Sequence, residues 1–196
     1  FLEWLENKFV NSNKLAVFFQ SAQKSNSSII NKKRNWITFV GKLNKAKGYD
    51  VFGNSIIKIL NKYPDWKSIV IGDEPREKIF FHHPNLKNLG FQNHNKVLNI
   101  FSKANIAVAC SRWEEPFGRT SLEAASRGSA VIISKKGGLP ETSKSAILIE
   151  ELSAKNIFDA IENLILNKTH LKNSQKQNYK NFIFDHKYIS KLIDDI

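Results

Sequence analysis

The sequence is short of the residues that mark membrane proteins and proteins of oxidising compartments. Its 196 residues contain one cysteine, Cys110, so no internal disulfide can form, which fits a reducing compartment. No apolar run approaches the roughly 20 residues that a membrane-spanning helix needs. There is no methionine and the first residue is Phe1, so we interpret the chain as part of a longer protein, in which an absent leader carries no information. We expect a cytoplasmic location, with a peripheral position at the inner membrane face left open.

Acidic side chains are also few. There are 18 of them against 30 lysines and arginines, which gives a formal net charge of +12. Such a surface attracts the phosphates of nucleic acids, anionic lipids or nucleotides, although a merely solvated basic face fits equally well. The lysines are spread along the chain, and the aromatic signatures of RNA-binding modules are missing. We therefore expect no nucleic-acid partner and leave an anionic membrane surface open.

Several catalytic motifs are absent as well. The sequence has neither a Walker phosphate-binding loop nor an Asp-x-Asp metal motif. His82, His83 and His94 do not show a convincing ligand spacing. We therefore predict no metal and no tightly bound cofactor. Cys110 lies in the apolar run "NIAVACS", which favours a buried core residue over a reactive thiol.

From Trp36 onward, short β-branched runs alternate with helical patterns. The runs lie at 36–41, 68–73, 88–91, 106–111, 130–134 and 146–150, and the helical patterns lie at 50–62, 94–104, 119–127 and 154–166, with a shorter helix after Pro75. Several runs are apolar on successive residues, as in strands that are covered on both faces. The pattern predicts an α/β fold, a Rossmann-like parallel sheet with helices on both faces and a ligand site at the carboxyl ends of the strands.

The two ends of the chain lack this alternation. We divide the sequence into a preceding segment over 1–35, the sheet domain over 36–170 and C-terminal helices over 171–196. The first segment contains a helix candidate, "FLEWLENKFV", a short strand candidate, "KLAVFF", and a polar linker. The last segment has no strand signal and predicts two helices with a break near 184–186.

Polar loops follow the predicted strands. In "VGKLNKAKGYD", Lys42 and Lys47 lie on one turn after the first strand, and two cations there suit a diphosphate. In "KKGGLPE", Gly137 and Gly138 let the backbone come close to a ligand, so their amides could bind phosphate or sugar. Each piece alone also fits an ordinary solvated turn.

The stretch "CSRWEEPFGRTSLEAASRG" combines acids with a bend that opens a helix. Its Pro-Phe-Gly bend leads into good helix formers, and the first turn of such a helix presents free N–H groups to an anion. Glu115 lies in the bend and Glu123 about one turn into the helix. Beside a phosphate site, carboxylates suit hydroxyl groups, although each alone also fits a solvated surface acid. Glu114 is assigned no role.

These motifs together resemble one family. The chain resembles the donor-binding half of a family 4 glycosyltransferase of the GT-B fold over about Trp36 to Leu166. The resemblance rests on the order of its motifs, which is G-K-L-x4-G, I-G-D, L-G-F, E-P-F-G-x4-E-A and G-G-L-P-E. In that family the active site lies between two Rossmann-like domains, and the C-terminal one holds the nucleotide-sugar. The resemblance implies that 36–170 is the nucleotide-sugar domain and that 1–35 is a linker and remnant of the acceptor-side domain.

The resemblance also implies roles for individual residues. Glu115 would contact the donor sugar at the reacting centre, and Glu123 would hold the ribose. Lys47 matches the phosphate lysine, and Lys42 stands where the family has arginine and so lacks the bidentate fork. The remaining implied donor contacts are Gln92 beside the base, the bend residues Phe117, Gly118, Arg119 and Thr120, and the Gly137-Gly138 pair. Arg119 replaces a usually apolar residue, so it either adds a phosphate contact or points outward.

The implied reaction is a retaining transfer of a sugar from a nucleoside diphosphate to an acceptor hydroxyl, in cell-surface glycan or glycolipid synthesis. Lys42, Lys47 and the helix start would stabilise the leaving diphosphate. The acceptor, a glycan or lipid-linked glycan, would be bound by the missing domain, so the chain alone is expected to be inactive. Two alternatives stay open: a nucleotide-sugar epimerase, and a basic polyanion-binding module without catalysis.

Overall fold

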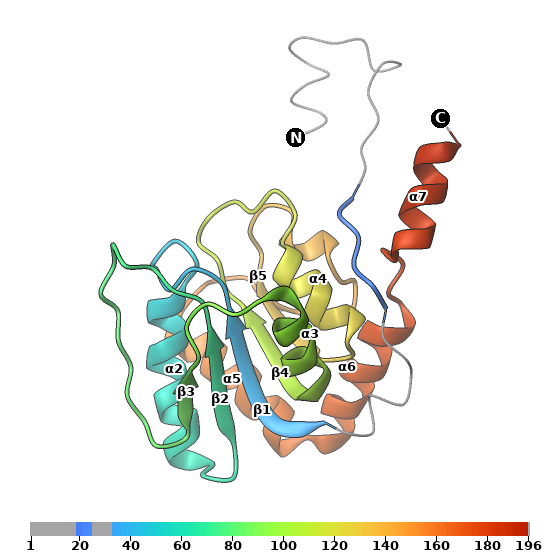
Figure 1. Cartoon of the computed structure of the whole chain (residues 1–196). Helices are drawn as coiled ribbons and strands as arrows, with labels where there is room; N and C mark the ends of the chain where they lie inside the picture. The colour runs from blue at the N-terminus through green and yellow to red at the C-terminus, as the bar shows by residue number, and fades with distance from the viewer. Residues whose placement is uncertain (1–18, 25–32, 196) are drawn as a thin grey trace.

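The structure is a computed structural model that describes residues 19–24 and 33–195, and it is built around a parallel six-stranded sheet (Figure 1). The strands are β1 (Arg34–Val40), β2 (Lys67–Ile71), β3 (Leu86–Asn88), β4 (Ala104–Ala109), β5 (Ala130–Ser134) and β6 (Ile147–Ile149). They lie in the order β3-β2-β1-β4-β5-β6, so the chain starts in the middle, runs outward to β3 and then crosses back to β4. This doubly wound order confirms the predicted Rossmann-like sheet.

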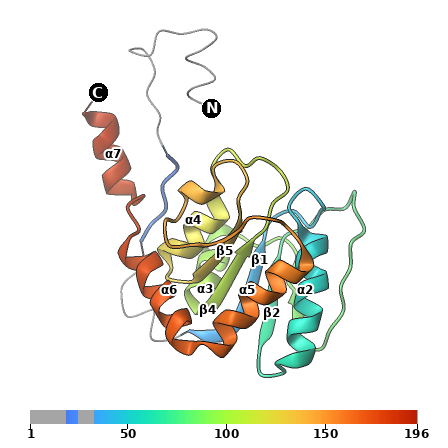
Figure 2. The same cartoon turned by 180° about the vertical axis from the view of Figure 1, so that it is seen from behind.

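Helices cover both faces of the sheet (Figures 1 and 2). They are α2 (Tyr49–Lys62), α3 (His94–Lys103), α4 (Arg119–Ser126), α5 (Ala154–Leu166), α6 (Lys168–Lys180) and α7 (His186–Asp194), with the short 3-10 helix η3 (Leu139–Glu141). One core layer joins the sheet to α2 and α5, and the other joins it to α3 and α4. All six predicted strands and four of the predicted helices are present within a few residues of their expected bounds.

The central strands are apolar because both of their faces are buried. β5 is buried along its whole length, and the alternate residues Ile37 and Phe39 of β1 pack on the α2–α5 side. β1 is paired with β2 on one side and with β4 on the other, with Phe39 opposite both Val70 and Val108. The connections from β1 and β4 leave the sheet in opposite directions, which opens a crevice at their carboxyl ends.

The loop after β2 differs from the prediction. The sequence predicts a helix after Pro75, but residues 75–77 form only a turn, and no regular element appears between β2 and β3. The Glu74 carboxylate accepts hydrogen bonds from the Arg76 guanidinium at 2.7 and 2.9 Å, which holds the chain in this turn. Phe81 then packs edge-on against Tyr49, so the loop is fixed by an aromatic contact.

The two ends of the described chain meet beside the sheet. The helix predicted in "FLEWLENKFV" and most of the strand predicted in "KLAVFF" lie outside the described residues, and residues 19–24 have no regular structure. Ala22 N–H donates to the Phe184 carbonyl at 2.9 Å. The two predicted C-terminal helices are α6 and α7, and the chain between them breaks over 181–185, close to the predicted position.

Candidate functional site

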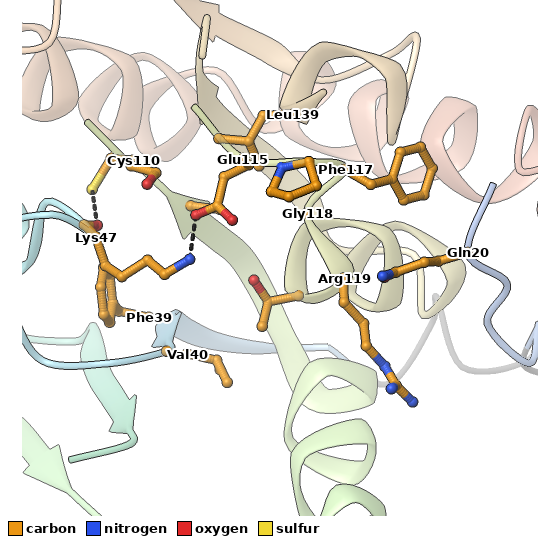
Figure 3. A pocket seen from close by; sticks show the side chains of 15 residues that line it. Gln20, Phe39, Val40, Lys47, Cys110, Glu115, Phe117, Gly118, Arg119 and Leu139 are labelled. Carbon is orange, nitrogen blue, oxygen red and sulfur yellow. Dashed lines mark hydrogen bonds and ion pairs between the residues drawn. The ribbon is translucent and has the colours of Figure 1, made fainter. Parts of the chain in front are cut away.

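A cavity of about 280 Å³ opens at the carboxyl ends of β1 and β4 (Figure 3). We call it the first cavity. Its walls come from the loop after β1, the loop after β4, the start of α4 and the segment before β1, which contributes Gln20. Among the predicted site residues it contains Lys47, Glu115, Phe117, Gly118, Arg119 and Thr120.

Lys47 and Glu115 form an ion pair in the first cavity, with Lys47 Nζ donating to Glu115 Oε1 (Figure 3). The exposed fraction is 32% for the Lys47 side chain and 13% for Glu115, so both still reach the cavity. Residues 68 positions apart in the sequence are thus brought into contact. The two opposite charges balance one another, so an anionic ligand would have to compete with Glu115 for the lysine.

The loop carrying Lys47 is fixed to the loop after β4. The Ala46 carbonyl accepts hydrogen bonds from Arg112 N at 2.8 Å, from Trp113 N at 3.1 Å and from Ser111 Oγ at 3.0 Å. Gly48 follows with a φ of 73°, and a Cβ there would come within 1.9 Å of the Cys110 carbonyl. Glycine is therefore required where the two loops cross.

The Gly137-Gly138 pair packs against the Glu-Pro-Phe bend. Gly138 N–H donates to the Glu115 carbonyl at 2.7 Å, and Gly137 N–H donates to a Glu114 carboxylate oxygen at 2.6 Å. A Cβ on Gly137 would lie 2.2 Å from the Glu115 carbonyl oxygen. Both amides that the sequence offered to a ligand are thus used within the chain, and neither glycine lines the first cavity.

Glu114 therefore has a contact that the sequence did not indicate. Its carboxylate binds the Gly137 amide and, at 3.2 Å, the Lys136 ammonium group, so it joins the bend to the glycine loop. No local pattern could show this, because the partners are more than twenty residues away.

The Phe117 side chain points away from the centre of the first cavity (Figure 3). It is 6% exposed and packs in a cluster with Phe19 and Phe184, at ring-centroid distances of 5.3 and 5.4 Å. The next residue, Gly118, has a φ of 110° and precedes α4. An aromatic anchor and a glycine thus set the direction of α4, whose first N–H groups have no acceptor within the helix.

A second cavity of about 490 Å³ adjoins the first and shares Val40, Gly41, Arg119 and Thr120 with it. The predicted site residues Lys42, Gln92 and Glu123 line this second cavity, together with Asp73, Phe91 and His94, which the sequence had not assigned. The Gln92 amide donates to the Leu89 carbonyl at 2.6 Å, and the Phe91 ring is 78% exposed. Two adjoining cavities can hold a ligand made of two linked groups, with one group in each cavity.

Glu123 lines the second cavity with a side chain that is only 5% exposed. Its Oε1 accepts hydrogen bonds from Arg119 Nε at 2.8 Å and from His94 Nε2 at 2.9 Å. The contact between Arg119 and Glu123 is expected from their i,i+4 spacing on α4. His94 starts a different helix, and nothing in its sequence surroundings points to this contact.

Cys110 borders the first cavity but is fully buried. Burial raises the pKa of its thiol to about 12, and its Sγ lies 3.4 Å from the Gly48 carbonyl as a weak donor. A thiol held in its neutral form is not a nucleophile, which confirms the prediction of a core cysteine.

Metal ligands do not gather in the part of the chain that the structure describes. No three side chains of the histidine, cysteine, aspartate and glutamate types lie close enough there to hold an ion. Among the same residues no helix is long and apolar enough to cross a membrane. The two cavities are lined by cations, by the start of α4 and by the carboxylates of Glu115, Glu123 and Asp73. Cations and helix N–H groups suit phosphate oxygens, and carboxylates suit hydroxyl groups.

Solved structures with the same fold place the domain in a class. The chain is similar to Anabaena HepE in complex with UDP and glucose, with a TM-score of 0.80 and 16% identity over 99% of this chain and 59% of that one. It is also similar to the C-terminal domain of LpcC, a group 1 family glycosyl transferase of Francisella tularensis, with a TM-score of 0.68 and 27% identity over 84% of this chain and 93% of that one. The fold is that of one half of a GT-B glycosyltransferase.

The family follows from the sequence match. The model of the glycosyl transferases group 1 family matches residues 20–182, and the chain belongs to this family. It is 28% identical to the GPI3 subunit of phosphatidylinositol N-acetylglucosaminyltransferase of Saccharomyces cerevisiae, over 66% of this chain and 30% of the relative. It is 27% identical to D-inositol 3-phosphate glycosyltransferase of Corynebacterium aurimucosum, over 66% of this chain and 34% of the relative. The chain spans about a third of these curated relatives.

Proposed function

We propose that the chain is the donor-binding domain of a family 4 retaining glycosyltransferase, which moves a sugar from a nucleoside diphosphate to an acceptor hydroxyl. The observation that carries this proposal is the pair of adjoining cavities, with Glu115 and Lys47 in one, Glu123 in the other and the start of α4 between them. A nucleotide-sugar has the same order of parts: sugar, diphosphate and ribose. The bound UDP and glucose of HepE support a ligand of this class.

In this arrangement the donor sugar occupies the first cavity and the nucleoside the second. The Glu115 carboxylate accepts hydrogen bonds from sugar hydroxyls, and Glu123 accepts them from the ribose. The diphosphate lies across the start of α4, where Arg119 and Thr120 border both cavities. Gln92 and the exposed Phe91 ring also line the second cavity, and they are assigned to the base.

Charge stabilisation is the main chemical contribution of this domain. Negative charge builds on the diphosphate as the bond to the sugar breaks, and preorganised cations lower the barrier. Lys47 is already in the first cavity, and Lys42 lines the second without an ion-pair partner in the described part of the chain. The free N–H groups of α4 add to these cations. No metal is required in this scheme, and calorimetric binding of the donor should be unchanged by EDTA.

The acceptor lies outside this domain. We propose that it is a glycan or lipid-linked glycan of the cell surface, held by a second domain, and that the net charge of +12 favours a position near an anionic membrane. The whole enzyme would then work on the cytoplasmic side.

The direct test is binding of UDP-, GDP- and ADP-sugars to the chain by calorimetry, with the Lys47→Met variant beside the wild type. We expect one donor to bind, and Lys47→Met to weaken it about tenfold, since a hydrogen bond to a charged group contributes about 1.5–3 kcal/mol. The free nucleoside should lose much less. Lys45→Met removes a nearby exposed lysine and serves as the control.

Other outcomes separate the alternatives. Binding of none of the donors, or equal losses for nucleoside and nucleotide-sugar, would contradict the proposal. Steep salt dependence without preference for any nucleotide-sugar would indicate a general polyanion surface. Turnover of a donor without acceptor would indicate an epimerase.

A further inference from the structure

The Glu123 carboxylate is held on one side only. Arg119 Nε and His94 Nε2 both donate to Oε1, at 2.8 and 2.9 Å. Within the part of the chain that the structure describes, the other oxygen, Oε2, accepts no hydrogen bond. Two donors from different helices thus fix the carboxylate and leave one oxygen for a ligand in the second cavity.

The burial of the three side chains shows which of them depends on the others. Glu123 is 5% exposed, whereas His94 is 52% and Arg119 is 62% exposed. A carboxylate this deeply buried is costly unless it is paired, while the two donors would be well hydrated on their own. The two hydrogen bonds therefore serve the carboxylate, because they hold it in a single orientation.

We propose that His94 and Arg119 are positioning residues that aim Oε2 of Glu123 at the ribose, and that His94 thereby sets the preference for ribose hydroxyls. The proposal rests on the proposed function, because it assumes that a nucleotide occupies the second cavity. Both residues line that cavity, so they are placed to act with the nucleotide present. Arg119 also lines the first cavity and uses only its Nε toward Glu123, so its remaining N–H groups can reach the diphosphate.

The experiment compares the affinities for two ligands that differ only in the ribose hydroxyls. The ratio of these affinities separates a general loss of nucleotide affinity from a loss of the preference for ribose. The probes are whichever of UDP, GDP or ADP binds best to the wild-type chain, and its 2′,3′-dideoxy analogue. We expect the wild type to prefer the ribonucleotide about tenfold or more, as for hydrogen bonds to a carboxylate. His94→Leu and Arg119→Leu should each reduce this ratio at least threefold, and His94→Gln, which keeps an N–H donor, should recover it in part.

His82→Leu is the matched control. His82 is also an exposed histidine, but it lies on the loop after β2 and lines neither cavity. The affinity ratio of the His82→Leu variant should therefore equal that of the wild type. Thermal melting of each variant confirms that it is folded. A wild-type ratio near one would overturn the ribose role of Glu123 and the positioning role together, whereas binding of none of the three nucleotides would overturn the proposed function. A wild-type preference that persists in both leucine variants would overturn the positioning role alone.

Discussion

Single residues at this site act through contacts with distant parts of the chain. Three glutamates contact residues that lie more than twenty positions away in the sequence. The pairs are Glu115 with Lys47, Glu123 with His94, and Glu114 with Gly137. The residue types suggested phosphate and hydroxyl chemistry, but the pairing makes the arrangement specific. Arg119 illustrates the difference, because the sequence left open whether it pointed outward, and the structure shows it bound to Glu123.

Gly137 offers a sharp test of the contact between the glycine loop and the bend. Gly137→Ala must adopt a φ of +54° and place its Cβ 2.2 Å from the Glu115 carbonyl oxygen. The left-handed conformation costs roughly 1–2 kcal/mol and the overpacking about 1–3 kcal/mol more. We expect urea unfolding to show the sum of both, and donor affinity to fall because Glu115 is displaced.

The matched control is Gly90→Ala. Gly90 has a similar φ of +63°, but a Cβ there meets no atom within 4 Å, so only the conformational cost remains. Equal destabilisation of the two variants would show that the bend yields to the extra methyl group.

At the scale of elements, the two loops beyond β1 and β4 are hydrogen-bonded to one another. Ala46, Arg112 and Trp113 join them through the backbone, and the Arg112 guanidinium adds an ion pair to Asp50 of α2 at 2.6 Å. The two loops that line the first cavity are thus held together by several contacts. Helices α3 and α4, which carry His94 and Glu123, are joined at their other ends by Lys33.

Lys33 is the basis of a pH-dependent prediction. Its ammonium group donates to the Phe101 and Arg127 carbonyls at 2.9 and 2.7 Å, and burial, with the Arg127 charge, lowers its pKa from 10.5 to about 7. Between these two values the unfolded chain binds a proton that the folded chain lacks, so the free energy of unfolding rises with pH in that window. Lys33→Met should remove this rise.

The measurement is urea unfolding at pH 7 and pH 9.5. The difference in stability between wild type and Lys33→Met should grow toward the higher pH. Lys172 is an exposed lysine on α6, and the Lys172→Met variant should show the same change in stability between the two pH values as the wild type. Parallel profiles for Lys33→Met and wild type would contradict the pKa assignment.

At the scale of the whole molecule, segments from both ends of the described chain support the site. Phe19 and Phe184 pack on Phe117 of the bend, and Phe182 is buried in the same layer. Gln20 reaches the first cavity from the same side. The segments before β1 and after α6 therefore take part in the structure around the bend.

Truncation tests this support. A chain ending at Asp185 loses α7, of which only Ile189 is buried, and we expect a modest loss of stability. A chain ending at Asn181 also loses the buried Phe182 and the partly buried Phe184. Burial of a whole phenylalanine side chain stabilises a fold by about 1.5–3 kcal/mol, and the partly buried Phe184 contributes less. We expect a markedly lower melting temperature and weaker donor binding in the shorter chain. Equal melting temperatures would show that the aromatic cluster contributes little.

The sequence by itself determined the sheet and most of its helices. Runs such as 130–134 are apolar on both faces, and caps such as Asn93 and Ser153 accept hydrogen bonds from the first turn of α3 and α5, so these elements follow from local chemistry. The helix expected after Pro75 failed because the Glu74–Arg76 contact and the packing of Phe81 prevail over a weak local preference.

Only the tertiary structure decided which polar groups meet. Motif order placed Glu115, Glu123 and Lys47 at one end of the sheet, because parallel strands bring their carboxyl ends to the same edge. The use of the Gly137 and Gly138 amides within the chain, and the attachment of His94 to Glu123, depend on how loops from separate strands pack. Such contacts join residues more than twenty positions apart, and no local pattern encodes them, because their energy exists only once the sheet has brought the loops together.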